Sequence, residues 1–199
     1  MNNNNPTNYS DLLERLDSND PSVRLQATTE LTRLTLRQIA TQTNQPEELP
    51  GVPRRIAVQI AYRLDEETYT DIRRELAYAL GVLSNGDNTI EDKMIIEEKL
   101  IASAVQDKDP HTRENAIEAL MKSKPLVAIG PFIQIATQDS DEDVRARALY
   151  ALADYLEDPN LPKQYFDQVL DCLRHVRDQN DSPYLQRLAR GVITLHEVK

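Results

Sequence analysis

The stretch Asp139–Leu152, with the sequence DSDEDVRARALYAL, is copied along the chain and constrains the fold more than any other feature. Its acidic turn is followed by Val144, Ala148 and Leu152, which are four residues apart and therefore fall on one side of a helix. Carboxylates at the start of a helix accept hydrogen bonds from its free N–H groups and suit the helix dipole. The stretch predicts a helix that begins at the acidic turn and buries one face.

Five segments share the pattern D-x-(D/P)-x-V-R-x-x-A-x-x-x-L with different fidelity. The copies that begin at Asp20, Asp107 and Asp139 are close, the copy at Asp71 is looser, and the copy at Asp181 has Gln in place of the arginine. The register residues, counted at the arginine position, are Arg24, Arg73, Arg113, Arg145 and Gln186. Their spacing averages about 40 residues, which is the period of arrays built from helix pairs.

The pattern resembles the second-helix signature of HEAT repeats, and the resemblance covers residues 8–198. It implies an all-α fold, a right-handed α-α superhelix of the HEAT/armadillo-like solenoid type with about five helix pairs. In such an array, neighbouring pairs bury each other's apolar faces. Five copies in register are specific for the fold, but the same fold serves many functions and the copies are nearly silent on activity.

The helices are expected to alternate with turns rich in Asp, Asn, Gly and Pro. Residues 1–7 are expected to be a disordered Asn-rich tail, and residues 8–199 a single repeat domain that contains the long loop Gln42–Pro53. Gly130 and Pro131 are expected to kink or break the first helix of the fourth repeat. The expected helices cover residues 9–16, 22–41, 54–64, 67–83, 89–104, 110–122, 126–137, 139–157 with its acidic turn, 163–177 and 183–198.

Composition narrows the classes of function. The formal net charge of −10 over 199 residues disfavours nucleic acids and anionic membranes as partners, whereas basic or zwitterionic protein surfaces remain plausible. A single cysteine, Cys172, excludes an internal disulfide, and no metal-ligand spacing or phosphate-binding glycine loop occurs, so no cofactor is expected. Without a signal-peptide pattern or a membrane-spanning apolar run, the protein is expected to be cytoplasmic and not inserted in a membrane.

The recurring arginines Arg24, Arg73, Arg113 and Arg145 have two interpretations. They could line a groove and bind a carboxylate or a phosphate. Alternatively, each arginine pairs with Asp residues of its own or the adjacent turn, and the set forms a structural ladder that fixes the angle between repeats. The resemblance to HEAT repeats favours the ladder.

A second recurring position lies six residues after the apolar register mark of each second helix, away from the buried stripe. It is occupied by Thr29, Tyr78, Glu118, Tyr150 and Gly191. Tyrosine is favoured in interfaces because it offers a large contact area with few rotatable bonds.

We therefore predict a partner-binding surface that contains Tyr78 and Tyr150, with Arg74, Arg147 and Arg187 nearby by helical offset. The alternative is that both tyrosines pack between neighbouring repeats and expose only their hydroxyl groups.

Three functions are compatible with a repeat array of this kind. The first is a non-catalytic protein–protein interaction scaffold or adaptor that uses the surface of the second helices, since no catalytic constellation is visible. The alternative is a phycobilin lyase-like or phycobilisome-handling HEAT protein that acts on a pigment–protein substrate, although no residue set can be carried over to such a site. A HEAT-like DNA glycosylase is disfavoured by the acidic charge and the lack of tryptophan. The sequence favours the scaffold and does not identify its partner.

Overall fold

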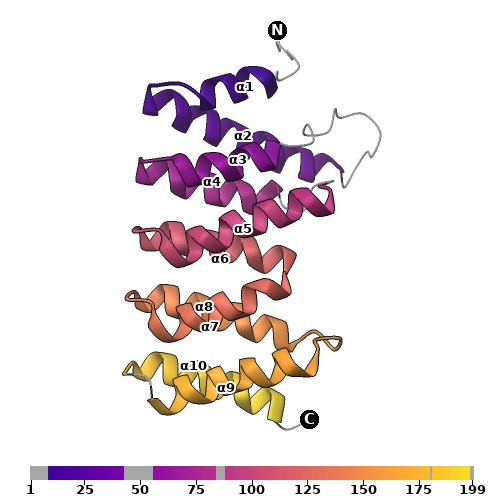
Figure 1. The fold of residues 1–199 in the computed structure, drawn as a ribbon, viewed down its shortest axis with the longest axis vertical. Helices are drawn as coiled ribbons and strands as arrows, with labels where there is room; N and C mark the ends of the chain where they lie inside the picture. The colour runs from indigo at the N-terminus through magenta and orange to yellow at the C-terminus, as the bar shows by residue number, and fades with distance from the viewer. Residues whose placement is uncertain (1–8, 43–55, 84–87, 180, 198–199) are drawn as a thin grey trace. The chain divides into compact units, whose positions relative to one another are not determined.

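The computed structural model describes residues 9–42, 56–83, 88–179 and 181–197, and all regular secondary structure in these ranges is helical (Figure 1). The predicted tail at residues 1–7 and most of the predicted loop Gln42–Pro53 lie outside the described residues. The chain divides into two compact units, residues 1–99 (unit 1) and 100–199 (unit 2), which are described separately. None of the described helices is long and apolar enough to span a membrane.

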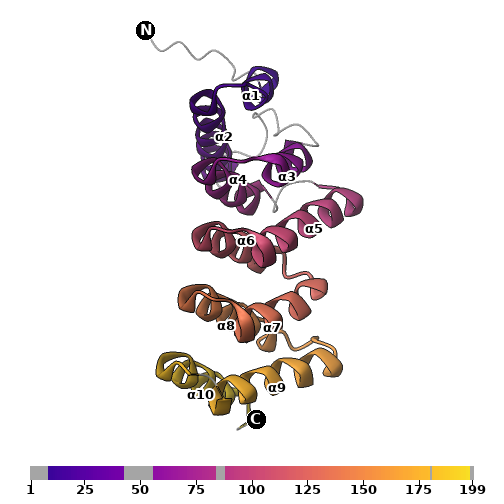
Figure 2. The same cartoon turned by 60° about the vertical axis from the view of Figure 1, so that its left-hand side comes forward.

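Unit 1 contains two helix pairs. Helix α1 (Tyr9–Leu16) packs against α2 (Pro21–Gln42), and α3 (Ile56–Glu66) packs against α4 (Thr70–Leu83). The two second helices, α2 and α4, also pack against each other, as Figure 2 shows. Helix α5 (Ile90–Gln106) begins in unit 1 and ends in unit 2.

Unit 2 repeats this arrangement. The second helices α6 (Pro110–Ser123), α8 (Glu142–Leu156) and α10 (Pro183–Glu197) are stacked on one side, and the first helices α7 (Ile129–Gln138) and α9 (Lys163–Gln179) lie on the other (Figure 2). Helix α8 packs against both α6 and α10, and α7 packs against α9. The three second helices therefore present one continuous surface.

The apolar stripe predicted from the repeat forms the core of unit 2. Val144, Ala148 and Leu152 on α8 are all fully buried. Phe132 on α7 is also fully buried, and its ring lies 6.4 Å from that of Tyr155 on α8. Each helix buries only one face, so its apolar residues are covered by the next helices of the array, as expected for stacked repeats.

The acidic turns begin the helices as predicted. Asp109 accepts from the backbone N–H of Thr112 at 2.8 Å, and Asp141 accepts from those of Asp143 and Val144 at 3.0 and 3.1 Å. Pro110 occupies the first position of α6, where a missing N–H costs nothing. These local signals account for the agreement between the predicted and observed starts of α6 and α8.

Two helix starts differ from the sequence-based expectation. Helix α4 begins at Thr70 rather than Glu67, because the carboxylate of Glu67 accepts from the N–H groups of Thr68 and Tyr69 and pairs with a distant arginine. The expected break at Gly130 and Pro131 lies earlier: a 3-10 turn at Leu126–Ala128 precedes α7, and Pro131 falls in the first turn of that helix. A proline in the first turn is tolerated there because those N–H groups have no partner within the helix.

Candidate functional site

Two of the recurring arginines form complete rungs of a ladder between repeats. In unit 1, Nε and Nη2 of Arg24 donate to the two carboxylate oxygens of Glu67 at 2.8 and 2.9 Å, and Nη1 donates to the carbonyl of Ser18 at 2.8 Å. A rung is thus one arginine, a carbonyl of its own turn and a carboxylate of the next turn. This geometry uses both edges of the planar guanidinium.

The same rung recurs in unit 2. Nε and Nη2 of Arg113 donate to the carboxylate of Asp139 at 2.8 and 2.7 Å, and Nη1 donates to the carbonyl of Asp107 at 2.8 Å. Both side chains of the ion pair are only 8% exposed. Asp139 also accepts from the N–H of Asp141 at 2.9 Å, so the rung fastens the acidic turn that begins α8 to the start of α6.

The remaining two ladder arginines are held differently. Nη1 of Arg73 donates to the carbonyl of Thr68 at 2.8 Å, within the turn before its own helix. Nη1 of Arg145 donates to the carbonyl of Asp139 at 2.9 Å, whereas its Nη2 lies 3.9 Å from the carboxylate of Asp181. All four arginines therefore bind a carbonyl of their own turn, and the carboxylates near Arg24, Arg113 and Arg145 come from the turn of the following repeat.

The rung in unit 1 also perturbs the pKa of its carboxylate. Burial of Glu67 on its own raises the pKa, but the hydrogen bonds from Arg24 and from the backbone of Tyr69 and Thr68 outweigh burial and hold the pKa below its ordinary value. The hydrogen bond to Glu67 likewise raises the pKa of Arg24. The ring of Tyr69 lies against this guanidinium, with its centroid 5.5 Å from Cζ. The pair is a structural ion pair that stays charged at neutral pH.

A pair of exposed tyrosines lies on the second-helix surface of unit 2. Tyr150 on α8 is 44% exposed, Tyr184 on α10 is 40% exposed, and their hydroxyl oxygens are 3.4 Å apart. The hydrogen bond to Tyr150 raises the pKa of Tyr184, and burial and the charges of Asp143 and Glu142 raise it further. The tyrosine pair therefore sits beside the acidic start of α8.

Sequence reasoning selected Tyr150 but missed Tyr184. In the repeat register the α10 position equivalent to Tyr150 is Gly191, which carries no side chain to make a contact. Tyr184 precedes Gly191 by seven residues and so lies on the same helix face, two turns nearer to the acidic turn. Inspection of the whole face, rather than the single register position, would have found it.

The two predicted arginines of unit 2 lie on the second helices α8 and α10. Arg147 on α8 is half-buried and pairs with Glu118 on α6 at 3.0 Å, which links the surfaces of these two helices. Arg187 on α10 is exposed and lines an open hollow together with Tyr184. Arg187 therefore lies near Tyr184, whereas the contact of Arg147 is with α6.

In unit 1, the predicted surface residues lie on α2 and α4. Tyr78 on α4 is 40% exposed, and Arg74 on the same helix forms an ion pair with Asp71 at 3.3 Å. On α2, Thr29 is exposed and lines an open hollow with Leu25 and Arg33. Both units therefore present side chains of the predicted surface set to solvent.

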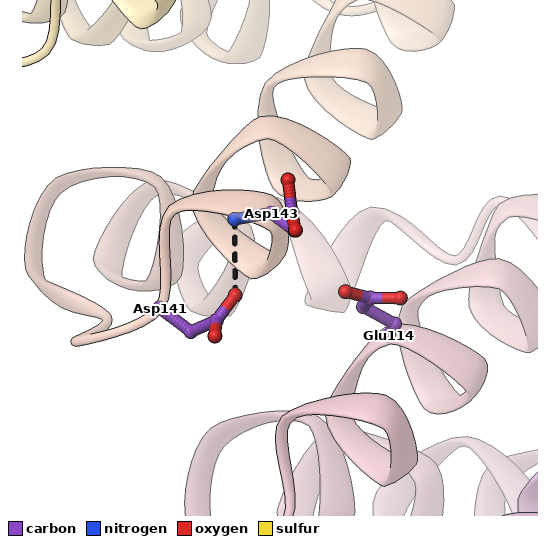
Figure 3. A group of neighbouring side chains, drawn as sticks. All are labelled: Glu114, Asp141 and Asp143. Carbon is purple, nitrogen blue, oxygen red and sulfur yellow. Dashed lines mark hydrogen bonds between the residues drawn. The ribbon is translucent and has the colours of Figure 1, made fainter.

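Three carboxylates gather at the start of α8, as Figure 3 shows. Glu114 comes from α6, whereas Asp141 and Asp143 belong to the acidic turn and the first turn of α8, and one oxygen from each lies within 4.8 Å of the others. Oxygen ligands of this kind suit hard cations. Oδ1 of Asp141 is already engaged as the helix cap, accepting from the N–H of Asp143. The arrangement concentrates negative charge at the start of α8 and thereby favours cationic groups.

Comparisons with known proteins bear on the fold of the chain. A family model described as HEAT repeats matches residues 58–153. No curated protein gives a match. Among solved structures, the chain is similar to a designed armadillo repeat protein in complex with the peptide (KR)4, with a TM-score of 0.65 and 16% sequence identity over 93% of this chain and 80% of that chain. At this level of identity, the likeness shows the fold alone.

Proposed function

We propose that this chain, which has a HEAT/armadillo-like fold, is a non-catalytic scaffold that binds a polypeptide segment on the second helices of unit 2. The tyrosine pair carries this proposal. Tyr150 and Tyr184 expose 44% and 40% of their surfaces side by side on the neighbouring second helices α8 and α10. Tyrosine rings give a large contact area at a low entropic cost, and they concentrate in binding surfaces for this reason.

The charges around the pair indicate the chemistry of the segment. The carboxylates of Glu114, Asp141 and Asp143 gather at the start of α8, and the charge of Asp143 contributes to the raised pKa of Tyr184. A lysine or arginine side chain can pair with these carboxylates and stack on a tyrosine ring. The designed armadillo repeat protein of similar fold was solved with a peptide of alternating lysine and arginine. We infer that the segment carries basic residues.

Fluorescence anisotropy with a labelled (KR)4 peptide tests this proposal. An acidic protein attracts a basic peptide without specificity, so the informative variant is the double substitution Tyr150→Ala/Tyr184→Ala, which leaves the net charge unchanged. We expect this variant to lose roughly tenfold or more in affinity, the effect of removing interface hot spots. Circular dichroism must show that the variant keeps the helical content of the wild type.

Tyr62→Ala provides the matched control. Tyr62 is 48% exposed on α3, a first helix of unit 1, so its removal deletes a similarly exposed ring that is not part of the proposed surface. We expect the control to bind (KR)4 as the wild type does. Equal affinity of the wild type, the control and the double variant would mean that only net charge attracts the peptide, and the proposed surface would be wrong. No observation among the described residues favours the lyase-like alternative.

A further inference from the structure

Arg145 differs from the two ladder arginines that form complete rungs. In the complete rungs the carboxylate stands six residues before the register residue of the next repeat: Glu67 before Arg73, and Asp139 before Arg145. The same position before Gln186 is Asn180, which offers an amide in the sequence and lies outside the described residues. The repeat pattern therefore supplies no carboxylate for the rung of Arg145.

The contacts of Arg145 agree with this difference. Its Nη1 binds the carbonyl of Asp139 at 2.9 Å, as in the other rungs. Its Nε is shielded from solvent and has no hydrogen-bond partner among the described residues, whereas Nε of Arg113 donates to Asp139 at 2.8 Å. The nearest carboxylate, that of Asp181, is 3.9 Å from Nη2 and its side chain is 91% exposed. A buried donor without a partner is costly, so this edge of the guanidinium favours an additional acceptor.

Arg145 lines an open hollow between the starts of α8 and α10. Its volume is about 450 Å³, and it is lined by Glu142, Arg145, Asp181, Ser182, Pro183, Tyr184 and Arg187. The carboxylate of Glu142 accepts a hydrogen bond from the hydroxyl of Ser182. Arg187 is exposed and adds a second guanidinium. The two arginines therefore balance the two acidic side chains, so that a group with a single negative charge meets less repulsion here than a dianion does.

We propose that this hollow binds a carboxylate through Arg145 and Arg187, and that the carboxylate takes the place that Glu67 and Asp139 occupy in the complete rungs. The group enters at Nη2 of Arg145, turns aside the exposed side chain of Asp181 and reaches Nε. A planar carboxylate matches the two parallel N–H groups of a guanidinium edge. The source of the group rests on the proposed function: it is an acidic side chain or the C-terminus of the bound polypeptide segment.

The position of the hollow specifies the order of charges in that segment. Tyr184 belongs both to the tyrosine pair and to the wall of the hollow, while the carboxylates of Glu114, Asp141 and Asp143 lie at the start of α8. A segment that places a basic residue at the acidic turn and an acidic group at Arg145 pairs with both the carboxylates and the guanidinium. The partner is therefore zwitterionic over a few residues rather than uniformly basic.

The Nε–H signals of the arginines in ¹H–¹⁵N NMR spectra test the carboxylate site directly. The probes are N-acetyl-aspartate N-methylamide, which mimics an acidic side chain, and N-acetylglycine, which mimics a C-terminus. The asparagine analogue of the first probe is the neutral control, and inorganic phosphate is the control for a dianion. We expect a carboxylate probe to shift the Nε–H signal of Arg145 saturably, while that of Arg113, already bonded to Asp139, stays in place. The probe that binds with the higher affinity shows whether the carboxylate comes from an acidic side chain or from a C-terminus.

Two substitutions on α10 locate the site. Arg187→Gln removes the second guanidinium from the hollow, and we expect it to weaken carboxylate binding about fivefold or more. Arg190→Gln removes an equally exposed arginine of the same helix that does not line the hollow, and we expect no change. Because both arginines are exposed, neither substitution is expected to unfold the protein, and the unshifted Arg113 signal verifies this in the same spectra.

Several results would overturn the site. One is an Arg145 Nε–H signal that coincides with those of Arg24 and Arg113 in the free protein and does not move, which would mean that the chain itself closes the rung. Another is an equal shift by the asparagine analogue or by phosphate, which would remove the selectivity for carboxylates. A protein that binds (KR)4 through its tyrosines but shows no Arg145 shift would retain the proposed function and lose this inference. A protein whose Arg145 signal shifts with a carboxylate probe, but whose affinity for (KR)4 does not depend on its tyrosines, would retain the carboxylate site and lose the peptide as its source.

Discussion

The buried rung of Arg113 and Asp139 should be a main determinant of the stability of unit 2, and a double-mutant cycle measures its contribution. Both side chains are 8% exposed and are joined by two hydrogen bonds of 2.8 and 2.7 Å. Removal of one partner leaves the other charge buried and unpaired, which typically costs about 3–5 kcal/mol. We expect Arg113→Met and Asp139→Ala each to lower the free energy of unfolding by this amount.

The double variant should lose much less than the sum of the two single variants, because it leaves neither charge without its partner. Coupling energies between contacting residues reach about 3 kcal/mol, and we expect a value near that limit here. The matched control is the exposed pair of Arg147 and Glu118, whose side chains are 39% and 42% exposed at a distance of 3.0 Å. Its coupling should be about 0.2–1 kcal/mol, the range for solvent-exposed pairs.

Urea denaturation followed by circular dichroism gives the four free energies of each cycle. With a slope of about 2 kcal/mol per molar urea, a loss of 4 kcal/mol moves the midpoint by about 2 M. Hydrogen exchange of the α6 and α8 amides assigns the loss to unit 2. The reasoning fails if the single substitutions at the rung cost less than about 1 kcal/mol, or if the buried and exposed pairs give the same coupling.

The fold could be predicted from the sequence because its signals are local. The four-residue spacing of Val144, Ala148 and Leu152 and the Asp residues that begin the helices are sufficient to place α8 and to set its register. The comparisons confirm the HEAT/armadillo-like class that this register predicted. The predicted start of α4, at Glu67, was wrong by three residues, because Glu67 is held by Arg24, a residue 43 positions earlier in the chain. No local pattern reports such a contact.

The candidate surface was only partly accessible to sequence reasoning. A register position can show that Tyr150 points away from the apolar stripe, and the structure gives it 44% exposure. The contact between Tyr150 and Tyr184 joins residues 34 positions apart on two helices, and it depends on how α8 and α10 stack. The hollow at Arg145 likewise depends on the distance of Asp181, which the repeat pattern does not encode. Contacts between repeats are therefore where the sequence is least informative.

Two further predictions concern single ionisable groups. Burial raises the pKa of the Cys172 thiol to about 11, so at pH 8 we expect a thiol-reactive dye to leave the native protein unlabelled over minutes and to label it rapidly in urea; fast labelling of the folded protein would contradict the buried position. The pKa of Glu67 is lower in the folded protein than its ordinary value of 4.5, because its hydrogen bonds favour the charged form. A depressed pKa contributes stability that is complete above about pH 5 and is lost as the pH falls through the folded pKa below 4.5. Glu67→Gln removes this titrating group, so urea midpoints measured from pH 6 to pH 3 should fall less steeply for the variant than for the wild type. Parallel pH profiles would show that Glu67 gains nothing from its charge in the rung with Arg24.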